Sequence, residues 1–274
     1  MQKTILITGS TDGLGKAVAI RLAKQGHRVL LHGRDPDKGE AVLAEIAAAS
    51  GNTSLTYYNA DLSSLKQVKA MASDILSSQD RLDVLVNNAG IGPRTPDSPR
   101  SISKDGYELF FAVNYLAGYL LVRELLPLLQ HTSNARIINV ASIAQAPVRF
   151  QDVMLEQEYD DGLAYRQSKL AQILHANHLA KSLAGTKVTA NSLHPASLMN
   201  TKMVLESTAL PDAMTTIDDG ADTLEFLISS PSLSNVSGAY FDGNNPATPN
   251  EQATDEAAMV QLKNISDSLI SGLI

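Results

Sequence analysis

The segment Thr8-Gly-Ser-Thr-Asp-Gly-Leu-Gly15 decides the fold, because it joins an apolar stretch to a stretch with helical periodicity. The apolar stretch, Lys3-Thr-Ile-Leu-Ile7, reads as a β-strand, and Lys16-Ala-Val-Ala-Ile-Arg-Leu-Ala-Lys24 reads as a helix. The three glycines permit, in order, a tight turn, a close approach of backbone to ligand, and packing of the helix on the strand. The N–H groups at the start of the helix then converge on one point, which favours a phosphate.

The spacing of these glycines narrows the kind of phosphate ligand. The pattern is G-x-x-x-G-x-G, which differs from G-x-G-x-x-G, and no Gly-Lys-Ser/Thr follows it. A nucleoside triphosphatase is therefore disfavoured, and a dinucleotide is the better interpretation. A turn with a purely structural role is the alternative.

The composition limits the class of protein. With 274 residues, 44% of them hydrophobic, the chain can bury a full core. With a net charge of −7 and a pI near 5.3, the protein has no overall positive electrostatic field that would attract nucleic acid or anionic membranes. The chain has no cysteine, which excludes disulfides and thiol nucleophiles, and its six histidines are scattered, so we expect no metal site. The absence of cysteine, of a signal pattern and of a long apolar run predicts a cytoplasmic protein without a membrane anchor.

Strand-like and helix-like segments alternate along the whole chain. The predicted strands are residues 3–7, 27–32, 54–59, 82–86, 135–141, 187–193 and 238–241, and the predicted helices are residues 16–24, 35–49, 65–77, 104–130, 163–183, 221–229 and 255–269. This alternation predicts an α/β fold with a seven-stranded parallel sheet and helices on both faces. No linker marks a boundary, so we expect one domain over residues 1–274, with a C-terminal extension from about residue 244.

Polar residues stand directly after most of the predicted strands. Arg34 follows the second strand, Asp61 the third, residues 87–90 the fourth, and Ser142 the fifth. Ligands of open parallel sheets bind beyond the carboxyl ends of the strands. These residues are therefore the first candidates for a site.

A tyrosine and a lysine lie four residues apart in the helix predicted over residues 163–183. Tyr165 and Lys169 share one face of that helix. A phenol with a pKa near 10 needs its phenolate stabilised by roughly 3 units, about 4 kcal/mol, to exchange protons near neutrality. A nearby ammonium and a cationic nicotinamide supply energy of that order in a partly desolvated site. Taken alone, such a pair is more often an ordinary helix surface.

Together, these segments resemble the short-chain dehydrogenase/reductase family over nearly the whole chain. The residues that carry the resemblance are Thr8 to Gly15, Asn87 to Gly90, Asn114, Ser142, Tyr165 and Lys169. The resemblance implies a Rossmann-type doubly wound fold and carbonyl–alcohol redox chemistry with a nicotinamide cofactor. The Tyr165 helix and the long gap that separates it from Ser142 are similar to the retinol dehydrogenase-like branch of the family.

The resemblance also implies roles for single residues. Tyr165 would exchange a proton with the substrate oxygen, Ser142 would hydrogen-bond that oxygen, and Lys169 would bind the nicotinamide ribose and lower the pKa of the tyrosine. Asn114 would hold a water that feeds protons to Lys169. The residues expected to bind the cofactor are Gly9, Ser10, Thr11, Gly13, Leu14, Gly15, Arg34, Asp61, Leu62, Asn88, Ala89, Gly90, Tyr165, Lys169, Pro195 and Thr201.

The end of the second strand indicates which nicotinamide cofactor is bound. An acidic residue there would accept the ribose hydroxyls of NAD(H), whereas an arginine nearby favours the extra phosphate of NADP(H). This chain has Gly33 at the acidic position and Arg34 next to it. We therefore expect NADP(H) to be favoured over NAD(H), although Asp35 could act in either direction and Arg34 could be a solvated turn residue.

The expected substrate is a small carbonyl or alcohol compound. Apolar residues in two loops would give a lipophilic pocket: Val148, Phe150, Val153, Met154, Leu198, Met199, Met203 and Leu205. Ordinary loop packing is the alternative for these residues. In the family, the two long helices over residues 104–130 and 163–183 form dimer surfaces, so a homodimer or homotetramer is expected unless the C-terminal extension blocks that contact.

Two rival functions share the fold class. One is a non-catalytic protein that senses a dinucleotide or acts as a scaffold, since a fold alone does not confer activity. The other is a methyltransferase on a Rossmann-like sheet. The presence of Ser142, Tyr165 and Lys169 in this order argues against both.

Overall fold

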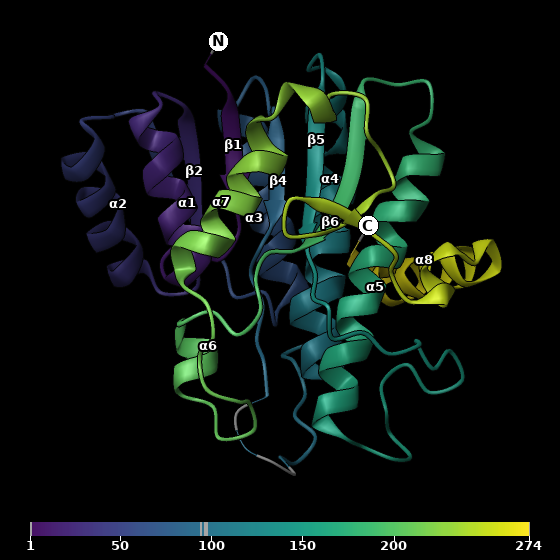
Figure 1. Cartoon of the computed structure of the whole chain (residues 1–274). Coiled ribbons are helices and arrows are strands. Elements are labelled where there is room, and N and C mark those ends of the chain that lie inside the picture. The colour runs from purple at the N-terminus through teal and green to yellow at the C-terminus, as the bar shows by residue number, and fades with distance from the viewer. Residues whose placement is uncertain (1, 94, 96–97, 274) are drawn as a thin grey trace.

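The computed structural model describes residues 2–93, 95 and 98–273, and its strands form one central sheet (Figure 1). The strands are β1 (Thr4–Ile7), β2 (Arg28–Gly33), β3 (Leu55–Asn59), β4 (Val84–Asn87), β5 (Ala135–Val140), β6 (Val188–His194), β7 (Tyr240–Asp242) and β8 (Asn245–Ala247). Their order across the sheet is β3-β2-β1-β4-β5-β6-β7-β8. β1 to β7 run parallel, which confirms the predicted Rossmann-type α/β fold.

The prediction of a seven-stranded sheet is wrong by one strand. The chain turns back at Gly243, whose φ is 58°, and β8 pairs antiparallel with β7. Residues 245–247 read Asn-Pro-Ala, which predicts a loop because proline cannot donate to a ladder. β8 tolerates Pro246 because it is the edge strand of the sheet.

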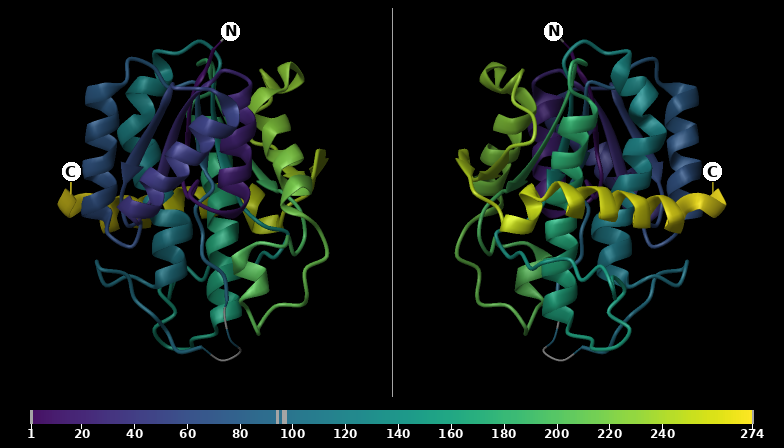
Figure 2. Two further views of the ribbon diagram at one scale, coloured as in Figure 1. Left: turned by 90° about the vertical axis from the view of Figure 1, so that its left-hand side faces the viewer. Right: turned by 90° about the vertical axis from the view of Figure 1, so that its right-hand side faces the viewer.

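Helices cover both faces of the sheet. The α-helices are α1 (Gly13–Lys24), α2 (Pro36–Ser50), α3 (Leu65–Ser78), α4 (Ala117–Gln130), α5 (Asp161–Ser182), α6 (Lys202–Leu205), α7 (Ile217–Ser229) and α8 (Glu256–Ile270). The shorter helical turns are η1 (Phe111–Leu116), η2 (Pro231–Leu233), η3 (Glu251–Thr254) and η4 (Ser271–Leu273). α1 packs with α2 and α7 on one face, and α3, α4 and α5 lie on the other. α8 lies across the outside of the second layer (Figure 2).

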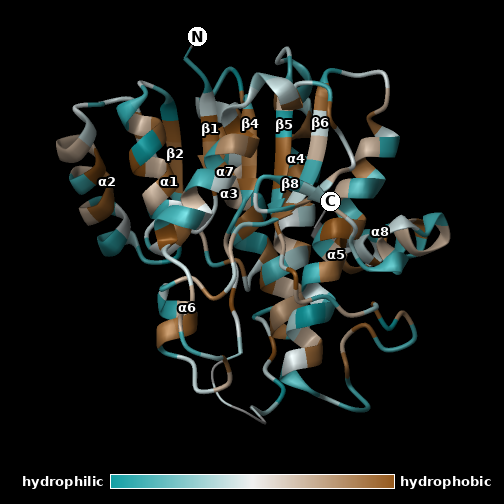
Figure 3. Cartoon of the chain, viewed as in Figure 1, coloured by the Kyte–Doolittle hydropathy of each residue, from teal (hydrophilic) through white to brown (hydrophobic). Residues whose placement is uncertain are grey.

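The alternation of side chains along the strands produces two cores. In β1, Ile5 and Ile7 point to the core beneath α1, α2 and α7, whereas Leu6 points to the core beneath α3, α4 and α5. All three side chains are fully buried. The strands β1, β2, β4 and β5 are accordingly strongly hydrophobic (Figure 3).

The helix predicted over residues 104–130 begins later than expected. Ile102 forms a β-bridge with Glu108 across a turn at Gly106, whose φ is 87°. The buried carboxylate of Glu108 then accepts the N–H groups of Phe110 (3.0 Å) and Phe111 (2.7 Å), which caps the helix that follows. Its first part, η1, is a π-helix that continues into α4.

Two other helices also differ from the predictions. α7 begins at Ile217 rather than at residue 221, because Thr216 and Asp219 form a capping box. α6 is a single turn and was not predicted.

One helical run has the length and composition of a membrane span. Within the described residues, Phe111–Gln130 has a mean hydropathy of 1.2, so the prediction that the chain lacks a long apolar run does not hold for this helix. However, 67% of that run is buried inside the protein. It therefore has the properties of a core helix.

α8 is tied to α4 by side-chain hydrogen bonds. Asp267 accepts hydrogen bonds from Tyr119 (2.7 Å) and Arg123 (2.6 Å), and it forms an ion pair with Lys263 (2.6 Å). The Tyr115 hydroxyl lies 2.7 Å from that of Ser266. α8 therefore covers part of the α4–α5 surface that the family resemblance associates with dimers.

We expect Asp267→Asn to lower the free energy of unfolding by about 1 kcal/mol, because it removes a partly exposed charge from three partners. Burial opposes the ionisation of Asp267, but the bonds from Lys263 and Tyr119 outweigh it and lower the pKa below 3.8. The contribution is therefore present above about pH 4 and is lost as the pH falls below that value. Urea unfolding at several pH values measures it, with Asp80→Asn as the exposed control. An equal loss at pH 7 and pH 2 would contradict the assignment.

Candidate active site

The carboxyl ends of the parallel strands bring the predicted site residues to one edge of the sheet (Figure 1). The glycine turn follows β1, Arg34 follows β2, and Asn88 follows β4. Ser142 lies beyond the end of β5, and Pro195 directly follows β6, where it is buried. These candidate residues therefore lie at the same end of the sheet, and their functional roles stay predictions.

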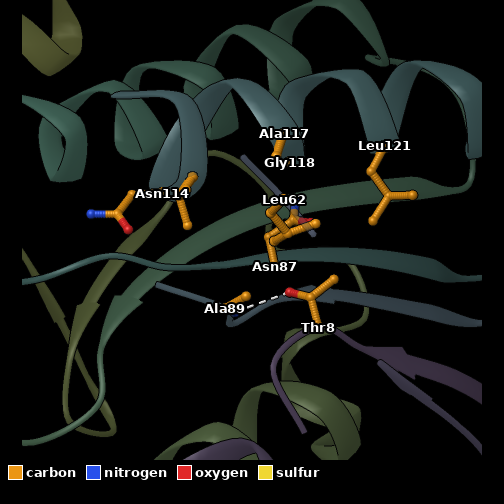
Figure 4. Close-up of a pocket in the computed structure, with 9 residues that line it drawn as sticks. Thr8, Leu62, Asn87, Ala89, Asn114, Ala117, Gly118 and Leu121 are labelled. Atoms are coloured by element: carbon orange, nitrogen blue, oxygen red, sulfur yellow. Dashed lines mark hydrogen bonds between the residues drawn. The ribbon is translucent and has the colours of Figure 1, made fainter. Parts of the chain in front are cut away.

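The glycine turn is packed against the segment after β4. A Cβ atom at Gly9, whose φ is 66°, would lie 2.8 Å from Ala89 Cα, and one at Gly15 would lie 2.6 Å from Asn88 Nδ2. The Thr8 hydroxyl accepts the N–H groups of Asn88 (2.9 Å) and Ala89 (3.0 Å; Figure 4). No larger residue fits at either glycine, because the turn packs directly on Asn88 and Ala89.

His32 fixes the turn from the other side, and the sequence analysis did not identify it. The Gly9 N–H donates to His32 Nδ1 (3.0 Å), and His32 Nε2 lies 3.1 Å from the Ala60 carbonyl oxygen. Nδ1 is thus an acceptor, so the proton of the neutral ring is on Nε2. Ser10 adds two bonds, from its N–H to the His32 carbonyl oxygen and from the His32 N–H to its hydroxyl (both 2.9 Å). Burial lowers the pKa of His32 to about 4.

The start of α1 carries a charged cluster. The Asp12 carboxylate accepts the Gly13 N–H (2.8 Å) and forms ion pairs with Lys38 (2.7 Å) and Lys202 (3.3 Å). Burial opposes its ionisation, but these bonds outweigh it and lower its pKa to about 2. Thr201 precedes Lys202, and its Cγ2 lies 3.4 Å from a Cβ atom built at Gly13. Lys202 and Thr201 thus bring the segment after β6 against the glycine turn.

The remaining residue of the turn, Leu14, is buried in the core beneath α1, so it contributes to the site only through its backbone.

The end of β2 has no room for an acidic side chain. A Cβ atom at Gly33 would lie 2.6 Å from Thr11 Cγ2. Arg34 is exposed, and its side chain has no ion pair or hydrogen bond with the residues that the structure describes. This geometry leaves one cation accessible at the predicted adenosine end of the site.

Asp61, at the end of β3, is already engaged by a residue that the sequence analysis did not select. Its carboxylate forms an ion pair with Lys104 (2.9 Å) and accepts the Ser63 N–H (3.0 Å). Burial opposes its ionisation, but the bonds from Lys104 and Ser63 keep its pKa below the ordinary value. Leu62 beside it is buried.

Tyr165, Ser142 and Lys169 come together as predicted. Ser142 lies near enough to the Tyr165 phenol to affect its pKa, and Ser142 Oγ accepts the Ala144 N–H (3.0 Å). Lys169 Nζ lies 5.7 Å from the centroid of the Tyr165 ring. The Phe110 ring meets the Tyr165 ring edge to face at 6.2 Å.

The Lys169 amine is buried and donates hydrogen bonds to two acceptors within the protein. Nζ donates to the Val140 carbonyl oxygen (3.0 Å) and to Gln172 Oε1 (3.1 Å). Of its three N–H bonds one is left for another ligand, and Gly90 borders the amine, since a Cβ atom there would lie 3.5 Å from Nζ. Burial lowers the pKa of Lys169 to about 7.

The lowering of the Tyr165 pKa by Lys169 stays a prediction, and Lys169 is not among the groups that shift this pKa in the protein alone. Burial raises the pKa of the Tyr165 phenol, and Ser142 offsets this rise only in part. The physical reason is that the amine is directed at Val140 and Gln172 and is itself desolvated. Stabilisation of a phenolate would need the positive charge of a bound nicotinamide in addition.

Asn114 lies in the π-helix η1 and links three segments. Its Oδ1 accepts the Ile91 N–H (2.8 Å), and its Nδ2 donates to the Ile91 carbonyl oxygen (3.1 Å) and to Ser168 Oγ (2.9 Å). Both amide hydrogens are therefore used within the protein. A cavity of about 10 Å³ beside Asn87 and Asn114 has room for one water (Figure 4). The proton-feeding role of Asn114 stays a prediction.

The apolar loop residues expected around the substrate divide into three groups. Val148 and Val153 are buried in the core, where Gln167 bonds the Arg149 N–H and the Val153 carbonyl oxygen (both 2.9 Å). Met203 and Leu205 in α6 are exposed. The others are half-buried: Phe150, Met154, Leu198 and Met199. The exposed and half-buried groups keep apolar surface that a ligand could contact without rearrangement of the core.

Comparisons with known proteins agree with this geometry. A family model described as short chain dehydrogenase matches residues 3–211. Retinol dehydrogenase 12 of Bos taurus is 34% identical over 277 residues, covering 98% of this chain and 86% of the relative.

Two solved structures have similar folds. An uncharacterised protein from Mycobacterium paratuberculosis superposes with a TM-score of 0.80 at 28% identity, covering 98% of this chain and 94% of that one. A 3-ketoacyl-(acyl-carrier-protein) reductase from Brucella melitensis, solved with NADH, superposes with a TM-score of 0.69 at 28% identity, covering 88% and 96%. The resemblance inferred from the motifs is confirmed.

We expect His32→Gln to reduce the loss of stability in acid. The unfolded chain binds a proton at His32 near pH 6.5 and the folded chain only near pH 4, so this group destabilises the fold as the pH falls through that window. The difference corresponds to about 3 kcal/mol at most. Denaturant unfolding between pH 6.5 and 4 should show a shallower decline for the variant than for the parent. The exposed control His131→Gln should keep the parent's slope, and identical slopes for all three proteins would refute the assignment.

Proposed function

The chain belongs to the short-chain dehydrogenase family of oxidoreductases and is similar to retinol dehydrogenases, and from this premise we propose that it is an NADP(H)-dependent enzyme that interconverts a lipophilic aldehyde or ketone and the corresponding alcohol. The observation that supports this proposal most directly is that Ser142 and the Lys169 amine both lie beside the Tyr165 side chain. A proton donor and a second hydrogen-bond donor close together are what the reduction of one carbonyl oxygen requires.

The chemistry divides between the cofactor and the chain. A bound nicotinamide would supply the hydride for reduction of a carbonyl carbon, or accept it in oxidation. Tyr165 gives its proton to the carbonyl oxygen during reduction and takes it back during oxidation. Ser142 bonds the same oxygen as negative charge develops on it, which favours the transition state over the ground state.

Lys169 has two roles in the proposal: it binds the ribose of the cofactor, and its positive charge acts on the Tyr165 phenol. Its remaining N–H is available for a ribose hydroxyl, and its ammonium form raises the local positive potential near the phenol. With a pKa near 7, the amine changes charge within the physiological range. A bound anionic cofactor would favour the ammonium form.

The preference for NADP(H) is proposed from the end of β2. Thr11 fills the space that an acidic side chain at position 33 would need, so a carboxylate cannot reach a ribose from there. Arg34 is exposed and has no partner among the described residues, which makes it available to a phosphate. The Brucella melitensis reductase was solved with NADH, so the preference depends on Arg34 and not on the comparison.

A lipophilic substrate is proposed from two features. Retinol, in the relatives' name, is a long apolar alcohol, and α6 presents Met203 and Leu205 with exposed side chains. The rival function, a non-catalytic dinucleotide sensor, would not need Ser142, Tyr165 and Lys169 near one another. Cytoplasmic localisation and homo-oligomerisation stay predictions.

Tyr165→Phe tests the catalytic assignment. The variant should bind NADPH with unchanged affinity, because the phenol is not needed for the dinucleotide turn, and it should lose at least about a hundredfold in turnover, since no other side chain replaces the proton donor. Turnover is followed by NADPH absorbance with a panel of apolar aldehydes and ketones. The control Tyr58→Phe changes a tyrosine that bonds Ser78, away from the site, and should keep full activity. Retained turnover in Tyr165→Phe would remove the assignment.

Arg34→Ala tests the cofactor preference. The affinity for NADPH should fall about ten- to hundredfold, as expected for loss of a charge-assisted bond, while the affinity for NADH stays the same. Titration of the reduced nicotinamide's fluorescence measures both values. Lys187→Ala removes an exposed positive charge at the opposite end of the sheet and serves as the charge control. If the ratio of the NADPH and NADH affinities is unchanged in Arg34→Ala, Arg34 does not bind the phosphate. The catalytic assignment would not be affected by that result.

A further inference from the structure

We propose that Gln172 is a positioning residue that holds the Lys169 amine in its working place. The inference rests on the proposed function and extends it to a residue that the motifs do not contain. Gln172 lies one turn beyond Lys169 on α5 and is buried. Its Oε1 accepts a hydrogen bond from Lys169 Nζ at 3.1 Å.

The amine has few other means of keeping its position. A lysine side chain has four rotatable bonds, and its ammonium group carries no shape that would fix it. Here Nζ is held between the Val140 carbonyl oxygen, from β5, and the Gln172 amide. Two acceptors on opposite elements define where the third N–H bond points.

The sheet holds the backbone of α5 at Gln172. The main-chain carbonyl oxygen of Gln172 accepts a hydrogen bond from Asn139 Nδ2 at 2.8 Å, and Asn139 Oδ1 accepts one from Asn87 Nδ2 at 2.9 Å. Asn87 and Asn139 are paired in the register of β4 and β5. The side chain of Gln172 is not used in these bonds, so its Oε1 is left for the Lys169 amine.

Removal of the Gln172 amide should act on the charge of Lys169. The buried ammonium would lose one of its two acceptors, which favours the neutral amine. A carboxylate in the same place would have the opposite effect and favour the ammonium. The other titratable groups that face Lys169 are Tyr165 on α5 and His194 at the end of β6, with Asp242 near His194, and neither variant changes them.

The experiment uses two variants of nearly equal volume, Gln172→Met and Gln172→Glu. The first readout is the extent of acetylation of Lys169 by acetic anhydride as a function of pH, measured by peptide mass spectrometry on the folded protein. Gln172→Glu should move the midpoint of labelling up by at least about one pH unit, which is a tenfold shift, and Gln172→Met should move it down. Exposed Gln130→Met is the matched control and should leave the midpoint unchanged.

The second readout separates positioning from packing. Gln172→Met should weaken NADPH binding by about tenfold and lower kcat, because the third N–H bond of Lys169 is no longer held in the direction of the ribose hydroxyl. Gln172→Glu should restore binding, since it again offers an oxygen acceptor, and should shift the pH profile of kcat/KM in the same direction as the labelling midpoint. If both variants label and bind as the parent does, Gln172 has no positioning role.

Failure of the proposed function would be seen separately. If the parent protein turns over no carbonyl compound but the labelling midpoints shift as described, the contact between Gln172 and Lys169 is established and the enzymatic assignment is wrong. If the parent is active and the midpoints do not move, the proposed function stands and this inference fails.

Discussion

The polar side chains of the site are arranged around one buried group, the amine of Lys169. A cation removed from water needs acceptors at fixed positions, and here they come from the end of β5 and from Gln172. Neighbouring positions are also polar although they are buried, and their amides are hydrogen-bonded: Asn139 to Asn87 and to the main-chain oxygen of Gln172, and Asn114 to the backbone of Ile91. An apolar core at this edge of the sheet would pack equally well, but it would leave the amine without partners. The candidate site is thus a polar layer built into the core rather than a set of side chains on its surface.

The glycine turn is also held by a buried polar side chain, but this side chain, the imidazole of His32, is neutral. His32 is buried, unprotonated and bonded at both ring nitrogens, so it connects β1, β2 and the end of β3 without charge. A charged residue there would oppose the cations that gather at the start of α1 and after β2. On the other side of the turn, the Thr8 hydroxyl accepts hydrogen bonds from Asn88 and Ala89, which follow β4. Both sides of the turn are therefore fixed by single side chains whose hydrogen-bonding capacity is fully used, and the backbone between them is left for a ligand.

The sequence predicted the fold and the position of the site because both depend on local patterns. Glycine spacing, strand periodicity and the four-residue spacing of Tyr165 and Lys169 are visible without tertiary contacts. What the sequence could not predict depends on partners that are distant in the chain: His32 with Gly9, Lys104 with Asp61, and Gln172 with Lys169 as a desolvated pair. The burial of Tyr165 and Lys169, which raises the pKa of the phenol and lowers that of the amine, likewise cannot be read from their spacing. β8 was missed because Pro246 is acceptable only at an edge, and the position of a strand in the sheet is a tertiary property.

The π-helix at Phe111–Leu116 gives the helix before the site one residue more than a regular helix would hold. A π-helical turn takes up an extra residue locally, so α4 after it keeps the face that packs on the sheet. Removal of a single residue between Phe111 and Leu116 would restore a regular α-helix and leave α4 in place, but it would displace the side chains within the turn. Asn114 would then lose its contacts with Ile91 and Ser168. The extra residue therefore serves the position of Asn114 rather than the packing of α4, and a one-residue deletion here would alter the site while the fold is kept.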